Sequence, residues 1–223
     1  SDSGILKVTV SGIWDDVQLS AYATWEGSGK LYPLGGITAP YFEGMGSNRF
    51  CPENTLTRAE AAVMLSRLTN YSDLTVYPSC GAADVPTGSW YTNAVNAFYD
   101  AGIETASYFR PNAAISRAEL SVWLYRLSGS PYVASSTIAF HDVATAGETH
   151  DAVAYGQLHS WINGYPDGTF RPNHSITRAE AAKLINRVTG RSLRVQAIVT
   201  QFTDVHASHW AYREIISAAN QVQ

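Results

Sequence analysis

The sequence predicts a mainly α-helical fold: a pseudo-threefold bundle of three repeats, two helices each, that the C-terminal helix closes into a ring. The first observation is the same Phe-x-Pro tripeptide at Phe50, Phe109 and Phe170. The second is a pentad that follows each tripeptide: Leu56-Thr57-Arg58-Ala59-Glu60, Ile115-Ser116-Arg117-Ala118-Glu119 and Ile176-Thr177-Arg178-Ala179-Glu180. Such periodic self-similarity is typical of folds in which each unit buries its apolar face against its neighbours.

Each pentad opens a predicted amphipathic helix. Apolar residues recur with helical spacing after it, at Ala61/Met64/Leu65/Leu68, Leu120/Trp123/Leu124/Leu127 and Ala181/Leu184/Ile185/Val188. The hydroxyl and the glutamate of each pentad have the spacing of a capping box, in which each satisfies a backbone N–H of the first turn. The pairs expected to have this structural role are Thr57/Glu60, Ser116/Glu119 and Thr177/Glu180.

A second repeated element precedes a second set of predicted helices, at residues 91–101, 149–160 and 211–220. It reads Ala83-Asp84-Val85, Phe140-His141-Asp142-Val143 and Phe202-Thr203-Asp204-Val205. Trp90 and Trp210 follow the valine by five residues in the first and third copies, and Glu148 stands there in the second. The aspartate suits a capping or turn-stabilising role.

The two ends of the chain predict circular closure. The last half-unit, 202–220, has no pentad after it, and the glycines and prolines of residues 22–40 exclude a helix before the first pentad. We expect 202–220 to pack beside the helix after Thr57 and to complete a domain at 39–223, with units at about 39–72, 81–130 and 138–190. Residues 1–38, with the alternation Leu6-Val8-Val10, predict a short β-like segment or the tail of a preceding module.

The amino-acid composition argues against some classes of binding partner and favours others. A net charge of −4 argues against nucleic acid, and no apolar run approaches the roughly 20 residues of a membrane span. Arginine outnumbers lysine by 12 to 3, and its planar fork suits carboxylate or phosphate. With 13 tyrosines and 6 tryptophans available for stacking, local anion sites on an acidic protein fit this composition.

The candidate anion sites are the three helix starts. Arg58, Arg117 and Arg178 occupy the first helical position, where we expect the side chain to point outward beside a hydroxyl and unpaired N–H groups. Two alternatives stay open from the residues alone: solvated surface arginines, or partners for Asp84, Asp142 and Asp204. The threefold recurrence favours a functional role.

The turn before the Phe-x-Pro tripeptide differs between the units and is intact in the last one. Gly164-Tyr165-Pro166-Asp167-Gly168 combines a proline that presets the backbone with a glycine that accepts positive φ. The middle unit is three residues shorter here, so its pocket is expected to differ. We expect the groove of Arg178, which lies in the unit with the intact turn, to be the best preserved and its side chain to be exposed.

The Phe-x-Asp-Val starts, the run Gly164–Pro172 and the pentad Ile-Thr-Arg-Ala-Glu together resemble the S-layer homology domain family over about residues 40–220. The resemblance implies a non-catalytic module of a larger secreted protein, at the cell wall or S-layer of a bacterium. It implies inter-repeat grooves that bind a secondary cell-wall polymer, including pyruvylated N-acetylmannosamine, whose carboxylate suits a guanidinium. The candidate ligand-binding residues are Arg58, Arg117, Arg178, Trp90, Trp210, Thr57, Ser116, Thr177, Tyr165, Asp167 and Gly168.

Other interpretations have weaker support. The same grooves would suit a protein–protein docking module. His206 and His209 lack an evident third metal ligand, and the His-Asp pairs at 141–142 and 150–151 lack a Gly-x-Ser-x-Gly nucleophile, so we expect no enzyme, metal or cofactor. Cys51 and Cys80 form a disulfide if their segments touch in an oxidising compartment, and are two independent thiols otherwise.

Overall fold

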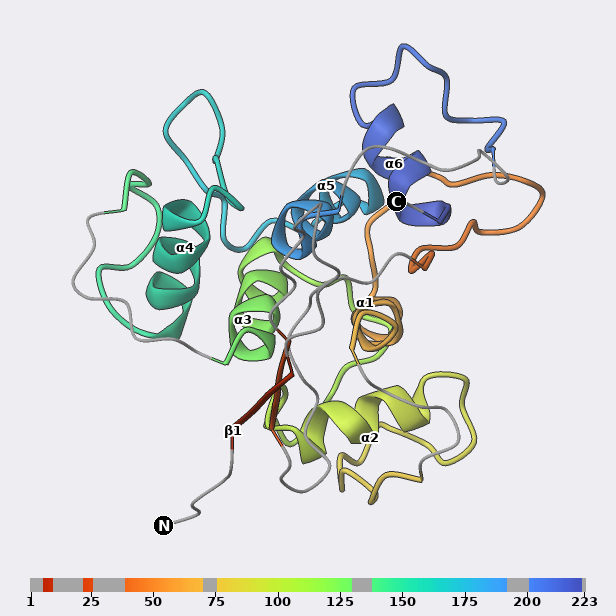
Figure 1. Cartoon of the computed structure of the whole chain (residues 1–223), viewed down its shortest axis with the longest axis vertical. Helices are drawn as coiled ribbons and strands as arrows, with labels where there is room; N and C mark the ends of the chain where they lie inside the picture. The colour runs from red at the N-terminus through yellow and green to blue at the C-terminus, as the bar shows by residue number, and fades with distance from the viewer. Residues whose placement is uncertain are drawn as a thin grey trace.

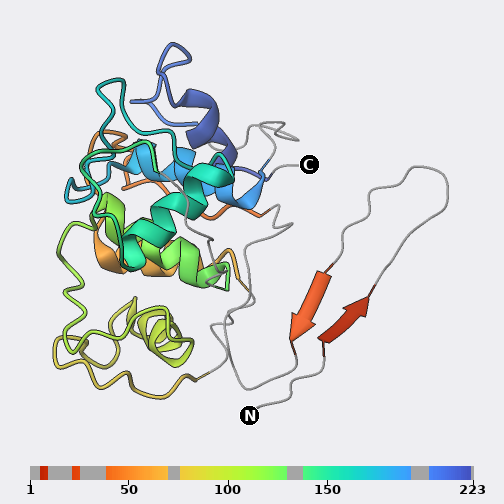
Figure 2. The ribbon, with the colours of Figure 1, turned by 90° about the vertical axis from the view of Figure 1, so that its left-hand side faces the viewer.

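The computed structural model describes residues 6–9, 22–25, 39–69, 76–129, 138–191 and 201–221. In these ranges the chain is mainly helical, as predicted. The helices are α1 (Arg58–Ser66), α2 (Thr92–Asp100), α3 (Arg117–Leu127), α4 (Glu148–Leu158), α5 (Arg178–Thr189) and α6 (Tyr212–Ala219) (Figure 1). Strands β1 (Leu6–Thr9) and β2 (Tyr22–Trp25) pair antiparallel, which agrees with the β-like N-terminal segment (Figure 2).

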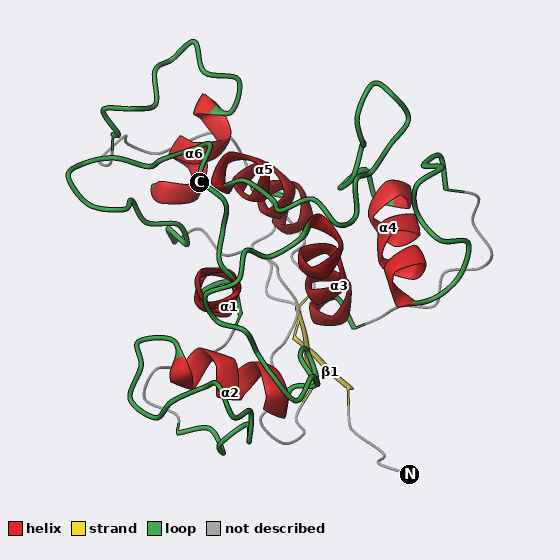
Figure 3. Cartoon of the chain, turned by 180° about the vertical axis from the view of Figure 1, so that it is seen from behind, coloured by secondary structure: helices red, strands yellow, loops and turns green. Residues whose placement is uncertain are grey.

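The helices that follow the pentads form the centre of the bundle. Helices α1, α3 and α5 lie innermost, and α2, α4 and α6 lie around them (Figures 1 and 3). Each outer helix packs on the inner helix before it in sequence: α2 on α1, α4 on α3 and α6 on α5. The expectation that 202–220 packs beside the helix after Thr57 is therefore wrong for its helix, because α6 packs on α5.

Backbone hydrogen bonds join the three helix starts in a closed ring. The N–H of Ile115 donates to the carbonyl of Leu56 (2.8 Å), Ile176 donates to Ile115 (3.0 Å) and Leu56 donates to Ile176 (3.1 Å). All three side chains are buried. The ring brings the start of each inner helix against the Phe-x-Pro turn of the next unit.

The repeated aspartates hold the Phe-x-Pro turns. Each carboxylate accepts two consecutive backbone N–H groups, those of Phe50 and Cys51 at Asp204, Phe109 and Arg110 at Asp84, and Phe170 and Arg171 at Asp142, at 2.6–2.8 Å. The middle residue of each turn has φ between 56° and 59°, which is costly without glycine. The predicted turn-stabilising role is confirmed, and these aspartates are not the partners of the pentad arginines.

The last half-unit closes the ring through the loop before α6 and through the end of α6 itself. Asp204 holds the turn at Phe50, and the N–H groups of Tyr41 and Phe42 both donate to the carbonyl of Ala218, at 3.0 and 3.2 Å. The ring of Phe202 packs on that of Phe50 at 5.2 Å. The circularly closed helical bundle predicted from the sequence is therefore confirmed, whereas the boundaries of the three units stay a prediction.

The disulfide between Cys51 and Cys80 does not form, and both cysteines are free thiols. Each repeated aspartate binds the Phe-x-Pro turn that follows it around the ring, not the turn that precedes it. The turn of Cys51 is therefore bound by Asp204, while the N–H of Cys80 donates to Asn96 of α2 at 3.0 Å. The two segments whose contact the bridge required belong to different parts of the ring.

Candidate ligand-binding grooves

The starts of the inner helices have no backbone N–H groups to offer an anion. The first amide of each donates to the neighbouring unit: Arg58 to Ala113, Arg117 to His174 and Arg178 to Asn54, each at 2.9 Å. The second amide donates to the carbonyl of a Phe-x-Pro proline, and the third donates to the capping hydroxyl, because all three capping boxes form as predicted. The predicted anion site at the helix amides is therefore wrong.

The pentad arginines reach under the turn of the next unit. Nε donates to a turn carbonyl in each case: Arg58 to Phe109 (2.6 Å), Arg117 to Phe170 (2.8 Å) and Arg178 to Phe50 (2.8 Å). The expected outward orientation is wrong for Arg58 and Arg178, which are 2% and 3% exposed. Arg117 is half-buried and lines a pocket.

The arginines also pair with the capping glutamates around the ring. The nitrogen–oxygen distances are 2.7 Å for Arg58–Glu119, 3.4 Å for Arg117–Glu180 and 3.6 Å for Arg178–Glu60. Each pentad glutamate thus caps its own helix and binds the arginine of the preceding unit. Pockets lie at two of these boundaries, beside Arg117 and beside Arg58.

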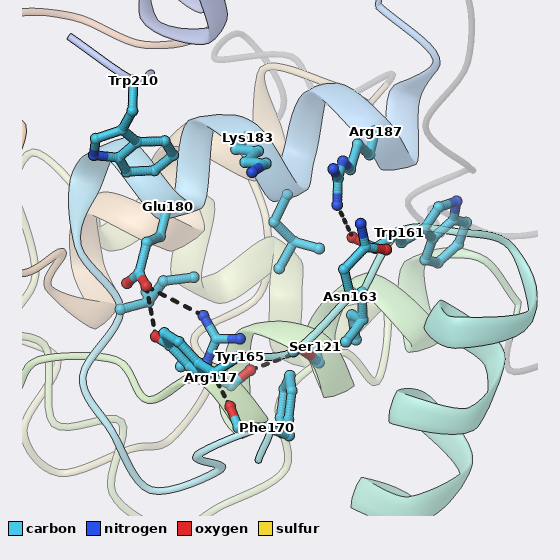
Figure 4. A pocket seen from close by; sticks show the side chains of 14 residues that line it. Arg117, Ser121, Trp161, Asn163, Tyr165, Phe170, Glu180, Lys183, Arg187 and Trp210 are labelled. Carbon is cyan, nitrogen blue, oxygen red and sulfur yellow. Dashed lines mark hydrogen bonds and ion pairs between the residues drawn. The ribbon is translucent and has the colours of Figure 1, made fainter. Parts of the chain in front are cut away.

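The first pocket, which we call the Arg117 groove, lies between α3 and α5 and has a volume of about 310 Å³. Figure 4 shows Arg117 and Tyr165 at its floor, Trp210 at one end and Trp161 at the other. The guanidinium of Arg117 lies 4.8 Å from the centre of the Tyr165 ring, whose hydroxyl donates to Glu180 at 2.7 Å.

One face of α5 forms a wall of this groove. Glu180, Lys183 and Arg187 are spaced so that they share one side of the helix (Figure 4). Nζ of Lys183 lies 5.4 Å from the centre of the Trp210 ring, and Arg187 donates to the carbonyl of Trp161 at 3.4 Å. Of the described residues that line the groove, three are cationic and one is a carboxylate.

Glu180 is ionised in this setting. Burial alone raises its pKa, but the Thr177 N–H, the Tyr165 hydroxyl and the charge of Arg117 lower the pKa below its ordinary value. The carboxylate offsets the charge of Arg117. Lys183 and Arg187 form no ion pair with a carboxylate of the described residues, and their charges face the groove.

The intact turn presents Tyr165 to this groove. The N–H of Gly168 donates to the carbonyl of Tyr165 at 3.0 Å, and Asp167 accepts from Thr169 and pairs with Arg171. Gly164 has φ 64°, and a Cβ there would clash with the Phe140 ring. Asp167 and Gly168 therefore shape the turn, whereas Tyr165 lines the pocket.

The second pocket, the Arg58 groove, lies between α1 and α3 and has a volume of about 530 Å³. Its cations are paired: Arg58 with Glu104 and Glu119, and Arg110 with Glu119 at 2.7 Å. Arg126 donates to both carboxylate oxygens of Glu148, at 2.6 and 2.5 Å. Burial raises the pKa of Glu104, but the N–H groups of Ala106 and Thr105 and the Arg58 guanidinium lower it overall, so this carboxylate is ionised.

Comparison with known proteins assigns two of these repeats to a family. The S-layer homology domain model matches residues 83–121 and 139–182, which include the second and third pentads. This chain belongs to the S-layer homology domain family. The first pentad and the segment Phe202–Val205 lie outside the matched segments, so a third S-layer homology repeat stays a prediction.

Relatives of this S-layer homology chain include proteins named for the cell surface. It is 34% identical over 195 residues to the cellulosome-anchoring protein of Acetivibrio thermocellus, covering 81% of this chain and 42% of that protein. It is 29% identical over 205 residues to cell surface glycoprotein 1 of the same organism, covering 83% and 9%. An amylopullulanase of Thermoanaerobacterium thermosulfurigenes is 34% identical over 151 residues, covering 64% and 8%.

The chain thus spans less than half the length of these relatives. The S-layer homology domain is an anchoring domain, and two of these relatives are named for anchoring or for the cell surface. Among the described residues, no helix is long and apolar enough to cross a membrane. Across the same residues, no three His, Cys, Asp or Glu side chains gather as a metal site, and His209 faces Glu53 at 3.2 Å.

The S-layer homology module brings together only some of the predicted site residues. Arg117, Tyr165 and Trp210 meet in the Arg117 groove, and Arg58 and Ser116 line the Arg58 groove. Arg178 packs against the first half-unit, with its guanidinium 4.7 Å from the Phe50 ring. Trp90 is exposed and lines neither pocket, and Thr57 and Thr177 serve as helix caps.

Sequence reasoning missed three residues of the Arg117 groove: Lys183, Arg187 and Trp161. One signal was available for Arg187, because an arginine stands in the same register after each pentad, at Arg67, Arg126 and Arg187. Lys183 stands where the other inner helices have valine, at Val63 and Val122. No repeated pattern marks Trp161.

Proposed function

We propose that this chain is a non-catalytic anchoring module that binds an anionic secondary cell-wall polysaccharide in the Arg117 groove. The observation that carries the proposal is the surplus of cations there, because Lys183 and Arg187 face the groove without a carboxylate partner among the described residues. A carboxylate-bearing ligand supplies the missing partner, and charge-assisted hydrogen bonds to arginine are strong.

The sugar of such a ligand finds aromatic surface beside these cations. Trp210 is 55% exposed at one end of the groove, and Tyr165 lies at its floor. Pockets that bind small ligands combine apolar walls with a few placed polar groups, and about 310 Å³ lies at the small end of their usual range. The groove therefore fits one anionic sugar at its centre.

Pyruvylated N-acetylmannosamine is the ligand that the family resemblance suggests, since its ketal carries a carboxylate. Binding on the face of α5 replaces the helix-start site expected from the sequence, whose amides are occupied. In this proposal the chain belongs to a larger secreted protein at the cell wall or S-layer of a bacterium, and the half-units at about 39–72 and 202–220 form its third repeat.

The test is sedimentation of the purified chain with isolated cell-wall sacculi, before and after chemical removal of pyruvate. We expect binding to the native wall and a loss of at least about tenfold in affinity after pyruvate removal, the value of one lost charge-assisted contact. Equal binding to both walls would contradict the carboxylate mechanism. Binding only to an envelope protein, with none to the polymer, would favour the docking module.

A further inference from the structure

The Arg117 groove has a second aromatic end that the proposed function does not use. Trp161 lines the pocket at the end away from Trp210 (Figure 4). Its ring centre lies 5.0 Å from that of Tyr155, at 78°, and 5.7 Å from that of His159. Tyr155 and His159 are 4.2 Å apart. These three rings form an aromatic cluster that borders the groove.

The backbone fixes the position of Trp161. Helix α4 ends at Leu158 with His159 as its C-cap, Ser160 takes φ 60°, and the N–H of Trp161 donates to the carbonyl of Gly156 at 2.7 Å. This is the Schellman arrangement of a helix end. A Cβ on Gly156 would lie 2.6 Å from the side chain of Ile162, so the turn is packed tightly against the helix. A ring held in this way loses little conformational freedom when a ligand binds.

The same helix end in the Arg58 groove provides a matched comparison. The N–H of Ile103 donates to the carbonyl of Phe98 at 2.8 Å, and Arg126 donates to the carbonyl of Ile103 at 2.7 Å, as Arg187 does to that of Trp161. Ile103 is 3% exposed. One backbone scaffold thus carries a buried aliphatic side chain beside the Arg58 groove and a half-buried tryptophan that lines the Arg117 groove. The scaffold does not require an aromatic ring there.

We propose that the Trp161 cluster is a second sugar subsite, so that the groove binds a stretch of at least two sugars. The inference rests on the proposed function of the Arg117 groove. The anionic sugar lies beside Lys183 and Arg187, and the next sugar of the polymer places its apolar C–H face on Trp161. Such C–H groups carry partial positive charge and pack favourably on the negative face of an aromatic ring.

The test compares two probes on the intact chain by calorimetry: a pyruvylated N-acetylmannosamine monosaccharide and a wall-polymer fragment of three or more sugars. The unmodified chain is expected to bind the fragment about tenfold more tightly, the equivalent of one good stacking contact. Trp161→Ile, which installs the residue of the Arg58 groove, is expected to remove that difference and to leave the monosaccharide affinity within about twofold. Tyr108→Ala is the control, because Tyr108 is exposed and lines neither pocket.

An equal loss for both probes in Trp161→Ile, or no loss for either, would overturn the subsite. Thermal unfolding of Trp161→Ile verifies that the variant is folded, and Trp161→Phe, which keeps an aromatic face, is expected to restore part of the fragment preference. Failure of the proposed function has a different signature, because the unmodified chain would then bind neither probe.

Discussion

The Arg117 groove and the Arg58 groove are built on the same scaffold and differ in charge. In both, an arginine at a helix start lies under the next unit's turn and pairs with that unit's capping glutamate. In the Arg58 groove, Glu104 also pairs with Arg58, and Glu148 neutralises Arg126. In the Arg117 groove the arginine meets Tyr165 instead, and Lys183 adds a charge where the other groove has Val122. The comparison teaches that the pentad arginines build the ring, whereas the charge that faces each groove depends on neighbouring residues that differ between repeats.

The largest expected effect concerns stability at the buried arginines. Arg58→Ala leaves Glu104 without its buried partner, so we expect a loss of about 3–5 kcal/mol in the free energy of unfolding. Arg117→Ala removes a half-buried side chain and is expected to cost about 2 kcal/mol. Urea unfolding with matched slopes measures both. A loss below about 1 kcal/mol for Arg58→Ala would show that the ring does not depend on this ion pair.

The next largest effect concerns Lys183, a cation that the Arg117 groove has and the Arg58 groove lacks. Lys183→Val gives α5 the residue that α3 has at Val122, and we expect about tenfold weaker binding of native wall polymer with unchanged stability. Calorimetry with the purified polymer measures the affinity, and Arg213→Ala, on the exposed side of α6, is the control for a lost positive charge. Equal losses in the two variants would mean that total charge alone attracts the polymer.

A smaller effect is a gain of binding in the neutralised groove. Glu148→Gln removes the carboxylate that pairs with Arg126. In a chain whose Arg117 groove is already disabled by Lys183→Val and Arg187→Ala, this change is expected to restore about threefold in affinity for the polymer. Surface plasmon resonance on immobilised polymer measures the gain. Absence of any gain would show that the Arg58 groove fails for a reason other than charge, such as its lack of Tyr165.

The smallest effect is an acid-dependent loss of stability at Glu104. Its pKa in the folded chain lies below the ordinary value of 4.5, so its stabilising contribution is complete above about that pH and is lost as the pH falls through the lowered pKa. Thermal melts between pH 6 and pH 3 are expected to show a steeper fall for the unmodified chain than for Glu104→Gln. Parallel curves would mean that Glu104 does not contribute through its charge.

The sequence predicted the fold well because the fold depends on local signals that repeat. Capping boxes at Thr57, Ser116 and Thr177, with the apolar stripes behind them, marked the starts of the inner helices to the residue. The binding surface was harder to predict, since the pairing of units is not local. The turn with Tyr165 belongs to the unit of Arg178, but it covers Arg117, the arginine of the unit before. The intact turn therefore lies at the groove of Arg117, one unit before the groove in which the sequence predicted it.

The sequence also did not show which arginines are paired with carboxylates. An arginine in the same register follows each pentad, yet Arg126 is neutralised by Glu148, Arg67 pairs with Glu43 at 2.7 Å, and Arg187 faces its groove. Their partners lie 22 and 24 residues away, on segments whose approach the pattern alone does not specify. Burial of Arg58 and Arg178 likewise follows from the neighbouring turns that cover them.

The most direct measurement compares Arg187→Ala with Arg126→Ala, two arginines of the same register in the two grooves. Affinity is measured by calorimetry on wall polymer with and without its pyruvate groups. On pyruvylated polymer we expect Arg187→Ala to bind at least about tenfold more weakly and Arg126→Ala to stay within about twofold of the unmodified chain. On the polymer without pyruvate, all three proteins are expected to bind equally weakly. Equal losses in the two variants on pyruvylated polymer, or a larger loss for Arg126→Ala, would contradict the assignment of binding to the Arg117 groove.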